Sequence, residues 1–405
     1  MSSETKIVVY YGPLSWFQTQ ARKKNSEGLL ESVFAHDELL RELRVVMPPQ
    51  EGETPREKAR WKRPKRLIAE SGDYASLNEH VITNFPGLVR ALKPKELHLH
   101  NPPAQVHAHL ERTFVNDGAF SVRTYDYPAV TRDTLVKFND GFEEHLVGQP
   151  GVRESLLAAL YPLTRASNDK PTVVMFYGPS GVGKTETAQF INGLLGGTLM
   201  RKQFSMFHND KFASYVFGGG HAEASFARDL LDRESGVILI DEFDKANSVF
   251  HSAFYQLFDG GTFEDKNYRV DVGRALIVCT SNYASEKEIR DALGDALYSR
   301  FDALVGFEPL TKDEVTTIIG RLVDDRVEAL EADEKGVIDA GFVKQRLEPV
   351  AGGLGNIRKL GKLADEMISM LLVGALLSDR ASTPDQGRGD ADVGDATTKR
   401  SQSDE

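Results

Sequence analysis

A glycine-rich stretch constrains this chain more than any other part of its sequence. It matches the pattern G-x-x-x-x-G-K-[ST] and consists of Gly178, Pro179, Ser180, Gly181, Val182, Gly183, Lys184 and Thr185. Glycines at these positions allow positive φ angles and bring backbone N–H groups onto phosphate oxygens. Lys184 supplies positive charge to the β- and γ-phosphates, and the hydroxyl of Thr185 is a ligand for Mg²⁺. The stretch therefore predicts a site for a nucleoside triphosphate.

The residues on either side fit a phosphate-binding loop. Residues 172–177 form a short apolar run that predicts a buried strand, and residues 186–195 have helical spacing. A strand that leads through glycines into a helix places the helix N-terminus at the anion. Thr187, near the start of this helix, is included among the predicted nucleotide-binding residues.

A second apolar run ends in two acidic residues. Residues 237–240 are Val, Ile, Leu and Ile, and Asp241 and Glu242 follow them. Asp241 is predicted to hold Mg²⁺, while Glu242 is predicted to orient and polarise the attacking water. A buried strand can also end in Asp simply because the carboxylate is solvated there. The phosphate-binding loop earlier in the chain favours the catalytic interpretation.

Composition restricts the class of protein. A length of 405 residues predicts two or three domains, and a net charge of −11 argues against broad nucleic-acid binding. No apolar stretch approaches the roughly 18 to 20 residues that a membrane span needs, and the N-terminus lacks a signal peptide. The single cysteine, Cys279, excludes an internal disulfide and is predicted to lie in the core. We expect a cytoplasmic protein without a membrane partner.

Four regions can be distinguished along the chain. They are a small α/β domain at 1–130, a region with alternating strands and helices at 131–310, a helical region at 311–377 and a disordered tail at 378–405. Within the first region, strands are predicted at 6–11, 96–100 and 120–125, and helices at 27–43 and 75–92. The charged, proline-containing segment 48–66 is predicted to be an exposed loop.

Three stretches of the second region resemble the AAA+ superfamily, and more narrowly its Clp-type unfoldase branch. They are residues 236–246 (GVILIDEFDKA), 254–261 (FYQLFDGG) and 276–282 (LIVCTSN). The resemblance covers about residues 135–375, whereas the first 130 residues resemble no family. It implies a P-loop ATPase core with a parallel five-stranded sheet between helices, followed by a C-terminal helical lid. ATP and Mg²⁺ would be its cofactors, and the N-terminal α/β domain would be separate.

The resemblance also implies roles for individual residues. Asn282 matches the first sensor, which helps to place the lytic water, although Asn is also common in turns at strand ends. Arg300 matches the arginine finger, which acts in trans on a neighbouring subunit's site; the alternative is a surface salt bridge. Arg358 matches the second sensor on the lid, and Val147 with Gly148 matches the segment that lines the adenine pocket.

The segment 214–220 (SYVFGGG) stands where Clp-type unfoldases carry a loop that grips an extended polypeptide in the pore of the ring. Tyr215 and Val216 are the predicted gripping pair, and the glycines would let the loop move. Phe217 departs from the family pattern, in which a glycine is usual. The competing interpretation places these aromatic and aliphatic side chains in the core.

Two other motifs give weaker evidence of function. The tripeptide 305–307 (VGF) is similar to a peptidase-docking motif, but its apolar flanks predict a core strand, so we expect no Clp-type partner peptidase. His98, His100, His107 and His109 are clustered, but their expected directions on a strand and a helix do not favour a zinc site.

The segment 56–66 holds seven basic residues around Trp61. It could contact a nucleic acid or an acidic partner, with Trp61 available for stacking. A solvated loop is the interpretation that charge runs usually favour.

The sequence therefore predicts an ATP-hydrolysing motor that assembles as a homo-oligomeric ring, a hexamer, and remodels or unfolds protein clients by threading. The N-terminal domain would select the client. An alternative is an AAA+ ATPase that acts on nucleic acid or a nucleoprotein complex, such as a loader or mobile-element ATPase. A third possibility is a nucleotide-gated scaffold.

Overall fold

The computed structural model describes residues 5–44, 61–115, 119–206, 209–354 and 357–382. Their contacts divide the chain into two compact units, residues 1–310 and residues 311–405. Both predicted α/β regions belong to the first unit, while the predicted helical region makes up the second. Among the described residues, no helix is both long and apolar enough to cross a membrane.

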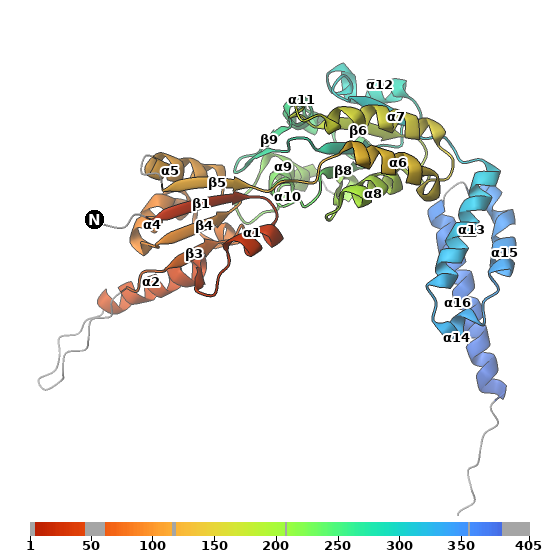
Figure 1. The fold of residues 1–405 in the computed structure, drawn as a ribbon, viewed down its shortest axis with the longest axis horizontal. Helices are drawn as coiled ribbons and strands as arrows, with labels where there is room; N and C mark the ends of the chain where they lie inside the picture. The colour runs from red at the N-terminus through yellow and green to blue at the C-terminus, as the bar shows by residue number, and fades with distance from the viewer. Residues whose placement is uncertain (1–4, 45–60, 116–118, 207–208, 355–356, 383–405) are drawn as a thin grey trace, which may run out of the picture. The chain divides into compact units, whose positions relative to one another are not determined.

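The N-terminal region is built on a five-stranded parallel sheet with the strand order β2-β3-β4-β1-β5 (Figure 1). Its strands are β1 (Lys6–Tyr11), β2 (Ser26–Gly28), β3 (Arg66–Ala69), β4 (Glu96–His100) and β5 (Phe120–Thr124). The sequence predicts β1, β4 and β5 but not the two short strands β2 and β3. The predicted loop at 48–66 ends where β3 begins, and its residues 48–60 lie outside the described part of the chain.

The two faces of this sheet are covered by different helices. Side chains alternate along β1, so Ile7 and Val9 join one apolar cluster whereas Val8 and Tyr10 join another. The first cluster includes residues of α2 to α5, and the second includes Phe17 of α1. These helices are α1 (Leu14–Ala21), α2 (Leu29–Arg44), α3 (Glu79–Thr83), α4 (Phe85–Leu92) and α5 (Ala104–Phe114).

The ATPase region contains a second five-stranded parallel sheet, with the order β12-β6-β11-β8-β7. Its strands are β6 (Thr172–Tyr177), β7 (Met200–Gln203), β8 (Val237–Asp241), β11 (Leu276–Thr280) and β12 (Ala303–Gly306). A short antiparallel hairpin, formed by β9 (Thr262–Glu264) and β10 (Arg269–Asp271), precedes β11. The apolar runs at 172–177 and 237–240 are strands, as predicted.

Helices cover both faces of this second sheet. Val174 and Phe176 of β6 pack with residues of α6 to α8, whereas Val173 and Met175 pack into a cluster that includes residues of α9 to α12. The helices are α6 (Arg132–His145), α7 (Pro150–Leu160), α8 (Lys184–Leu195), α9 (Asn209–Phe217), α10 (Phe226–Leu231), α11 (Tyr255–Gly260) and α12 (Glu286–Tyr298). The predicted parallel sheet between helices is confirmed.

The two sheets of the first unit are joined by direct contacts. The side chain of Tyr11 packs against the apolar clusters of both regions. The backbone N–H of Ala104, at the start of α5, donates to the carbonyl of Asn267 in the β9–β10 turn (2.8 Å). The N–H of Leu14 donates to the Asp232 carboxylate (2.8 Å). Residue 130, the predicted domain boundary, therefore separates two sheets within one compact unit.

All regular secondary structure among the described residues of the second unit is helical. It consists of α13 (Lys312–Glu328), α14 (Ala332–Lys335), α15 (Ala340–Leu354) and α16 (Ile357–Ser382). The capping box predicted at the start of this region is present between Thr311 and Glu314. Helix α16 continues to Ser382, so the tail predicted from Ser378 starts too early; residues 383–405 lie outside the described part.

Gly236, just before β8, packs against the segment that follows the first sheet. It therefore tests how closely this segment and the second sheet pack. A Cβ atom at Gly236 would lie 2.0 Å from the carbonyl oxygen of Pro128. We expect Gly236→Ala to lower the free energy of unfolding by about 1–3 kcal/mol, because two backbone segments would have to move apart. Chemical denaturation followed by circular dichroism measures the change.

The matched control is Gly193→Ala in α8, where no atom lies within 4 Å of the added Cβ. This helix-interior change should be neutral or stabilise the protein by about 0.5–1 kcal/mol. Equal destabilisation by both variants would contradict the packing argument.

Candidate functional site

The phosphate-binding loop lies between β6 and α8, as predicted. Gly178, Gly181 and Gly183 have φ angles of 123°, 84° and 105°, which side-chain-bearing residues rarely adopt. A Cβ atom at Gly178 would lie 2.3 Å from the carbonyl oxygen of Phe307, and one at Gly183 would lie 2.3 Å from Cδ1 of Leu146. The glycines are therefore required by both backbone conformation and space, and helix α8 begins directly after them.

Lys184 turns its ammonium group back over the loop. Its Nζ donates to the carbonyls of Gly178 (2.6 Å) and Pro179 (2.7 Å) and to Oδ1 of Asn282 (3.3 Å). Lys184 is only 9% exposed, and these three acceptors offset the cost of burying its charge. The contact with Asn282 brings two predicted site residues together, one from the start of α8 and one from just after β11.

The other predicted loop residues differ in exposure. Pro179 and Ser180 are exposed, Gly181 and Thr185 are half-buried, and Val182 is buried. Thr187 is also buried, and its hydroxyl donates to the carbonyl of Gly183 (2.9 Å). This hydrogen bond joins the first turn of α8 to the loop, and the predicted contact of Thr187 with the nucleotide stays a prediction.

Asp241 ends strand β8 with a carboxylate that has partners on both oxygens. Arg201 donates to Oδ2 from Nε (3.0 Å) and Nη2 (2.5 Å), and Thr280 donates to Oδ1 (2.5 Å). Asp241 is 5% exposed, so the Arg201 charge offsets the cost of burying it. The sequence did not identify Arg201 as part of the site, because its approach to Asp241 depends on the pairing of β7 with β8.

Glu242 follows at the edge of the sheet in an unusual backbone conformation. Its φ and ψ are 55° and 45°, a left-handed geometry that costs a non-glycine residue of order 1–3 kcal/mol. Its N–H donates to Oγ1 of Thr280 (2.9 Å), and Gln203 Nε2 donates to Oε2 of its carboxylate (3.1 Å). These contacts hold the carboxylate predicted to polarise water, and Gln203 is a second functional residue that the sequence did not reveal.

The segment predicted to line the adenine pocket lies beside the loop. Leu146 is the side chain that a Cβ on Gly183 would meet, while Val147 and Gly148 are half-buried. Gln149 holds the segment in place through two hydrogen bonds with the backbone of Glu308, at 2.8 and 2.9 Å. This pair of bonds is a positioning contact that no sequence pattern indicated.

Arg300 contacts Asp259, Ala296 and Tyr255. Its Nε donates to the Asp259 carboxylate (2.9 Å), another guanidinium nitrogen donates to the carbonyl of Ala296, and the guanidinium lies 4.4 Å from the ring centre of Tyr255. The salt bridge considered as an alternative is therefore present. Arg300 also lines a cavity of about 940 Å³ together with Asp259 and Ser299.

Arg358 belongs to the second compact unit. It lies in the first turn of α16, where its side chain is exposed. Its predicted role as the second sensor stays a prediction.

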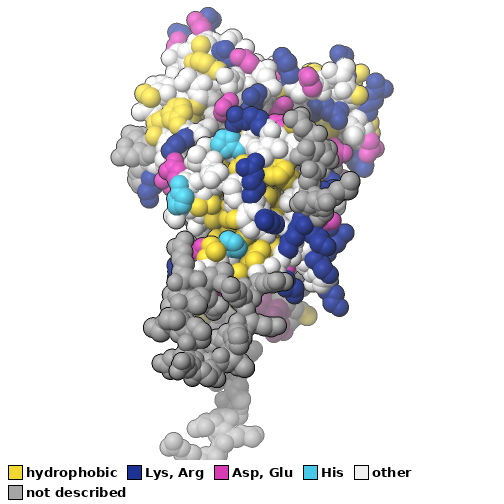
Figure 2. All heavy atoms as spheres, turned by 90° about the vertical axis from the view of Figure 1, so that its left-hand side faces the viewer, with side chains coloured by type: hydrophobic (Ala, Val, Ile, Leu, Met, Phe, Trp, Pro, Cys, Tyr) yellow, Lys and Arg dark blue, Asp and Glu magenta, His cyan; other side chains and the backbone are white. Residues whose placement is uncertain are grey.

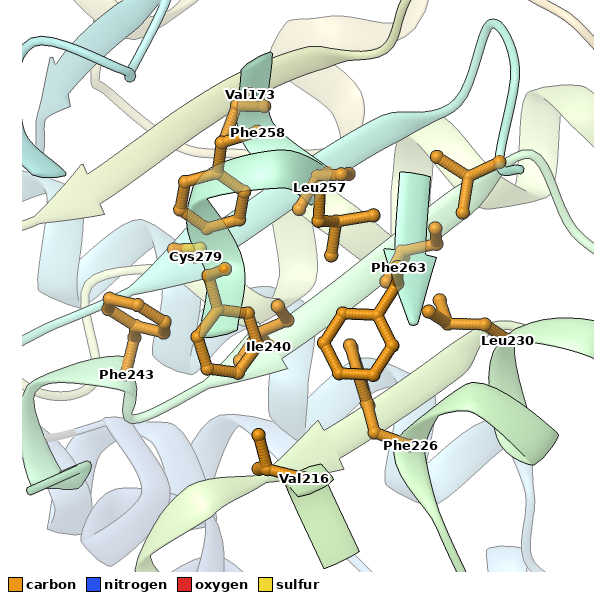
Figure 3. Close-up of a cluster of buried hydrophobic side chains, with 14 of the residues drawn as sticks. Val173, Val216, Phe226, Leu230, Ile240, Phe243, Leu257, Phe258, Phe263 and Cys279 are labelled. Carbon is orange, nitrogen blue, oxygen red and sulfur yellow. The ribbon is translucent and has the colours of Figure 1, made fainter. Parts of the chain in front are cut away.

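The predicted gripping pair is wrong in its side-chain placement. Tyr215 and Val216 lie on helix α9 and are 4% and 0% exposed. Figure 3 shows Val216 within the cluster of apolar side chains that includes Phe226 and Ile240. The Tyr215 hydroxyl donates to Asp229 (2.6 Å), and burial raises the pKa of this tyrosine, with Asp229 adding to the effect. Of the three predicted residues, Phe217 is the exposed one, at 46%.

The residues of two weaker motifs are engaged within the protein. Val305 and Phe307 are buried at and just beyond the end of β12, in the core. Among the described residues, no group of three His, Cys, Asp or Glu side chains could hold a metal ion. His98 instead bonds to Tyr10, and His107 bonds to Tyr11.

The arrangement defines a nucleoside-triphosphate site at the carboxyl edge of a parallel sheet. The cradle at Gly178 and Gly183 has no room for side chains, and the Lys184 ammonium points into the loop, so these residues fit a polyphosphate. Thr185 and Asp241 offer the oxygen ligands that Mg²⁺ prefers. The fold and site together are those of a P-loop ATPase.

Comparison with known proteins narrows this class. Residues 169–324 match the AAA domain (Cdc48 subfamily) family. The chaperone protein ClpB of Chlamydia pneumoniae is 28% identical over 290 residues, which cover 60% of this chain and 33% of ClpB. The AAA+ ATPase ClpV1 of Pseudomonas aeruginosa is 29% identical over 240 residues, which cover 53% of this chain and 26% of ClpV1.

A solved structure supports the same fold. The closed-state cryo-EM reconstruction of Hsp104 with ATPγS and FITC casein has a TM-score of 0.54 at 14% identity, with 94% of this chain and 90% of that chain covered. Residues 169–324 therefore match an AAA domain and are similar to Clp-type AAA+ ATPases, which confirms the resemblance seen in the sequence, and ATP and Mg²⁺ are the cofactors. The chain spans about a third of the length of ClpB and a quarter of that of ClpV1.

Substitution of Lys184 tests the phosphate-binding role. We expect Lys184→Ala to weaken ATP binding by at least about 100-fold, because the loss of one charge-assisted contact to phosphate costs roughly 3 kcal/mol. Fluorescence of a labelled ATP analogue measures the affinity. Lys137→Ala is the control: Lys137 is an exposed lysine of α6 that pairs with Asp133 (2.8 Å), so this variant should bind ATP like the unchanged chain. Unchanged affinity in Lys184→Ala would contradict the assignment.

Proposed function

We propose that this chain hydrolyses ATP as a ring of identical subunits, six in number, and uses the energy to remodel or unfold protein clients. The observation that carries the proposal is the meeting of Lys184 with Asn282, and of Asp241 with Thr280, at the carboxyl edge of the second sheet. The names of the relatives support it, since ClpB is described as a chaperone and ClpC as the ATP-binding subunit of a Clp protease.

The residues of the site have different proposed roles in hydrolysis. The loop glycines and Lys184 bind and orient the phosphates, and Thr185 and Asp241 would hold Mg²⁺, which neutralises phosphate charge when bound. Glu242, held by Gln203 and the Thr280 hydroxyl, removes a proton from the attacking water, while Asn282 positions that water.

Completion of the site requires a second subunit. Arg300 would leave Asp259 and reach the phosphates bound by a neighbouring copy, where its charge stabilises the transition state. Because the Arg300–Asp259 ion pair is partly exposed to solvent, breaking it costs little, of order 0–1 kcal/mol. Arg358 would report the nucleotide state to the helical unit.

The exposed client-binding element is best placed at residues 217–224, which connect α9 to α10. The base of this loop is fixed by two hydrogen bonds from the hairpin turn: Lys266 N–H donates to the Phe217 carbonyl (2.9 Å), and Asn267 Nδ2 donates to the Gly219 carbonyl (3.0 Å). The Phe217 side chain is exposed and can contact a polypeptide. This placement replaces Tyr215 and Val216 as the gripping residues. A cytoplasmic location and the absence of a partner peptidase stay predictions.

Glu242→Gln gives the decisive experiment. Without the carboxylate, hydrolysis should fall by about 10²–10⁴-fold while ATP binding persists, so ATP-bound assemblies should accumulate. Light scattering should give the mass of six chains, and the assemblies should hold fluorescently labelled casein, an unfolded protein. Lys184→Ala is the matched control that should hold none. Assemblies that bind nucleic acid but not casein would favour the alternative, an ATPase that acts on nucleic acid.

Phe217→Ala tests threading. We expect it to slow the unfolding of a tagged fluorescent protein by about tenfold, which corresponds to about 1.4 kcal/mol of lost client contact. Tyr161 provides the control because its side chain is 43% exposed, against 46% for Phe217, and it lies outside the loop. Unfolding at the normal rate by Phe217→Ala, or equal loss in Tyr161→Ala, would refute the assignment of this loop.

A further inference from the structure

Six basic side chains gather along the edge at which the strands of the N-terminal sheet begin. Figure 2 shows this end of the molecule, where Lys and Arg side chains are frequent among the described residues. The exposed residues Lys6, Lys62, Lys65, Arg90, Lys93 and Lys95 form what we call the basic edge. It lies opposite the carboxyl edge of the same sheet, from which Leu14 and Ala104 contact the ATPase region.

Backbone pairing makes these side chains neighbours. Lys65 and Lys95 directly precede β3 and β4, and Lys6 begins β1. Lys6 N–H donates to the carbonyl of Lys95 (2.9 Å), and Glu96 N–H donates to the carbonyl of Lys65 (3.1 Å). Because paired strands lie about 4.8 Å apart, the backbones of these three lysines form a row along the edge, and Lys6 lies one register position further along, opposite Glu96. Arg90 and Lys93 extend the row from the last turn and the C-cap of α4.

The charges of the basic edge are not neutralised. In the part of the chain that the structure describes, no Asp or Glu forms an ion pair with any of its six residues. The one carboxylate within the row, Glu96, is engaged by Arg66 and His98. This local excess of positive charge stands out in a chain with a net charge of −11, so it favours a polyanionic partner.

The neighbouring Trp61 and Arg63 are occupied by structural contacts. Trp61 Nε1 donates to the Leu92 carbonyl (2.8 Å), and its ring meets the His36 ring edge-on with 4.9 Å between centroids. Arg63 donates to the carbonyls of Lys93 and Pro94. The tryptophan that the sequence offered for base stacking therefore packs against the protein. What the basic edge offers is charge without an aromatic platform.

We propose that the basic edge docks double-stranded nucleic acid through its phosphate backbone, without reading its sequence. Single-strand binding would need exposed aromatic side chains on which bases stack, and Trp61 is not one. Lysine ammonium groups are flexible point charges that suit phosphates, and a duplex presents one phosphate charge per about 1.7 Å of its axis. This surface is separate from the proposed ATP and client sites, so the motor would act on proteins held near nucleic acid.

Salt-dependent binding tests the proposal on the full chain. Fluorescence anisotropy with labelled random-sequence duplexes, one DNA and one RNA, should show binding that weakens steeply between about 50 and 200 mM salt. The test variant changes Lys62, Lys65, Lys93 and Lys95 to Gln, and it leaves Trp61 and Arg63 intact. We expect affinity to fall at least tenfold at low salt and the slope of log K against log salt to flatten by about three to four units.

The control variant makes the same change in charge elsewhere. It changes the exposed lysines Lys170, Lys287, Lys335 and Lys362 to Gln, and it should bind duplexes like the unchanged chain. Absence of duplex binding, or equal loss in both variants, would overturn the proposal. So would binding of polyglutamate, lost only in the basic-edge variant, without binding of duplexes, because the partner would then be an acidic protein. Rates of ATP hydrolysis measured in parallel separate this failure from failure of the ATPase assignment.

Discussion

The buried ammonium group of Lys184 is the interaction on which the site depends. A cation removed from water must find acceptors, and Lys184 finds them in two loop carbonyls and in the amide of Asn282. The carbonyls are available because the loop turns through positive φ angles, which requires its glycines. Asp241, nearby on β8, is compensated separately by Arg201 and Thr280. Each charge at this edge thus has a protein partner that a bound phosphate or metal ion can replace.

Elements that a short stretch of sequence determines could be predicted, whereas elements that depend on contacts with distant residues could not. The strand before the phosphate loop and the strand that ends in Asp241 are short apolar runs bounded by glycine or acidic residues. Their positions could therefore be predicted. Strands β2 and β3 have three and four residues, and they exist because neighbouring parallel strands pair with them. Arg201 and Gln203 could not be placed in the site for the same reason: their approach to Asp241 and Glu242 follows from strand pairing.

The wrong prediction that Tyr215 and Val216 are exposed came from the glycines that follow them. The glycines at 218–220 suggested that an exposed loop begins at residue 214, but helix α9 extends to Phe217. Phe212, Tyr215 and Val216 are all buried, which is the i, i+3, i+4 spacing of a helix face packed on a core. The glycines do not exclude a helix before them, because Gly218, with a φ of 82°, ends the helix only after Phe217. The exposed residue is the last before the glycines.

Asn267 has a consequence for how the two sheets of the first unit work together. Its carbonyl accepts from Ala104 of the N-terminal region, and its side chain donates to Gly219 of the exposed loop. Tyr11 packs against the cores on both sides. A displacement of that loop would therefore be transmitted through Asn267 to the N-terminal sheet. A replacement of the N-terminal sheet would therefore also remove a contact of the hairpin turn that holds the loop.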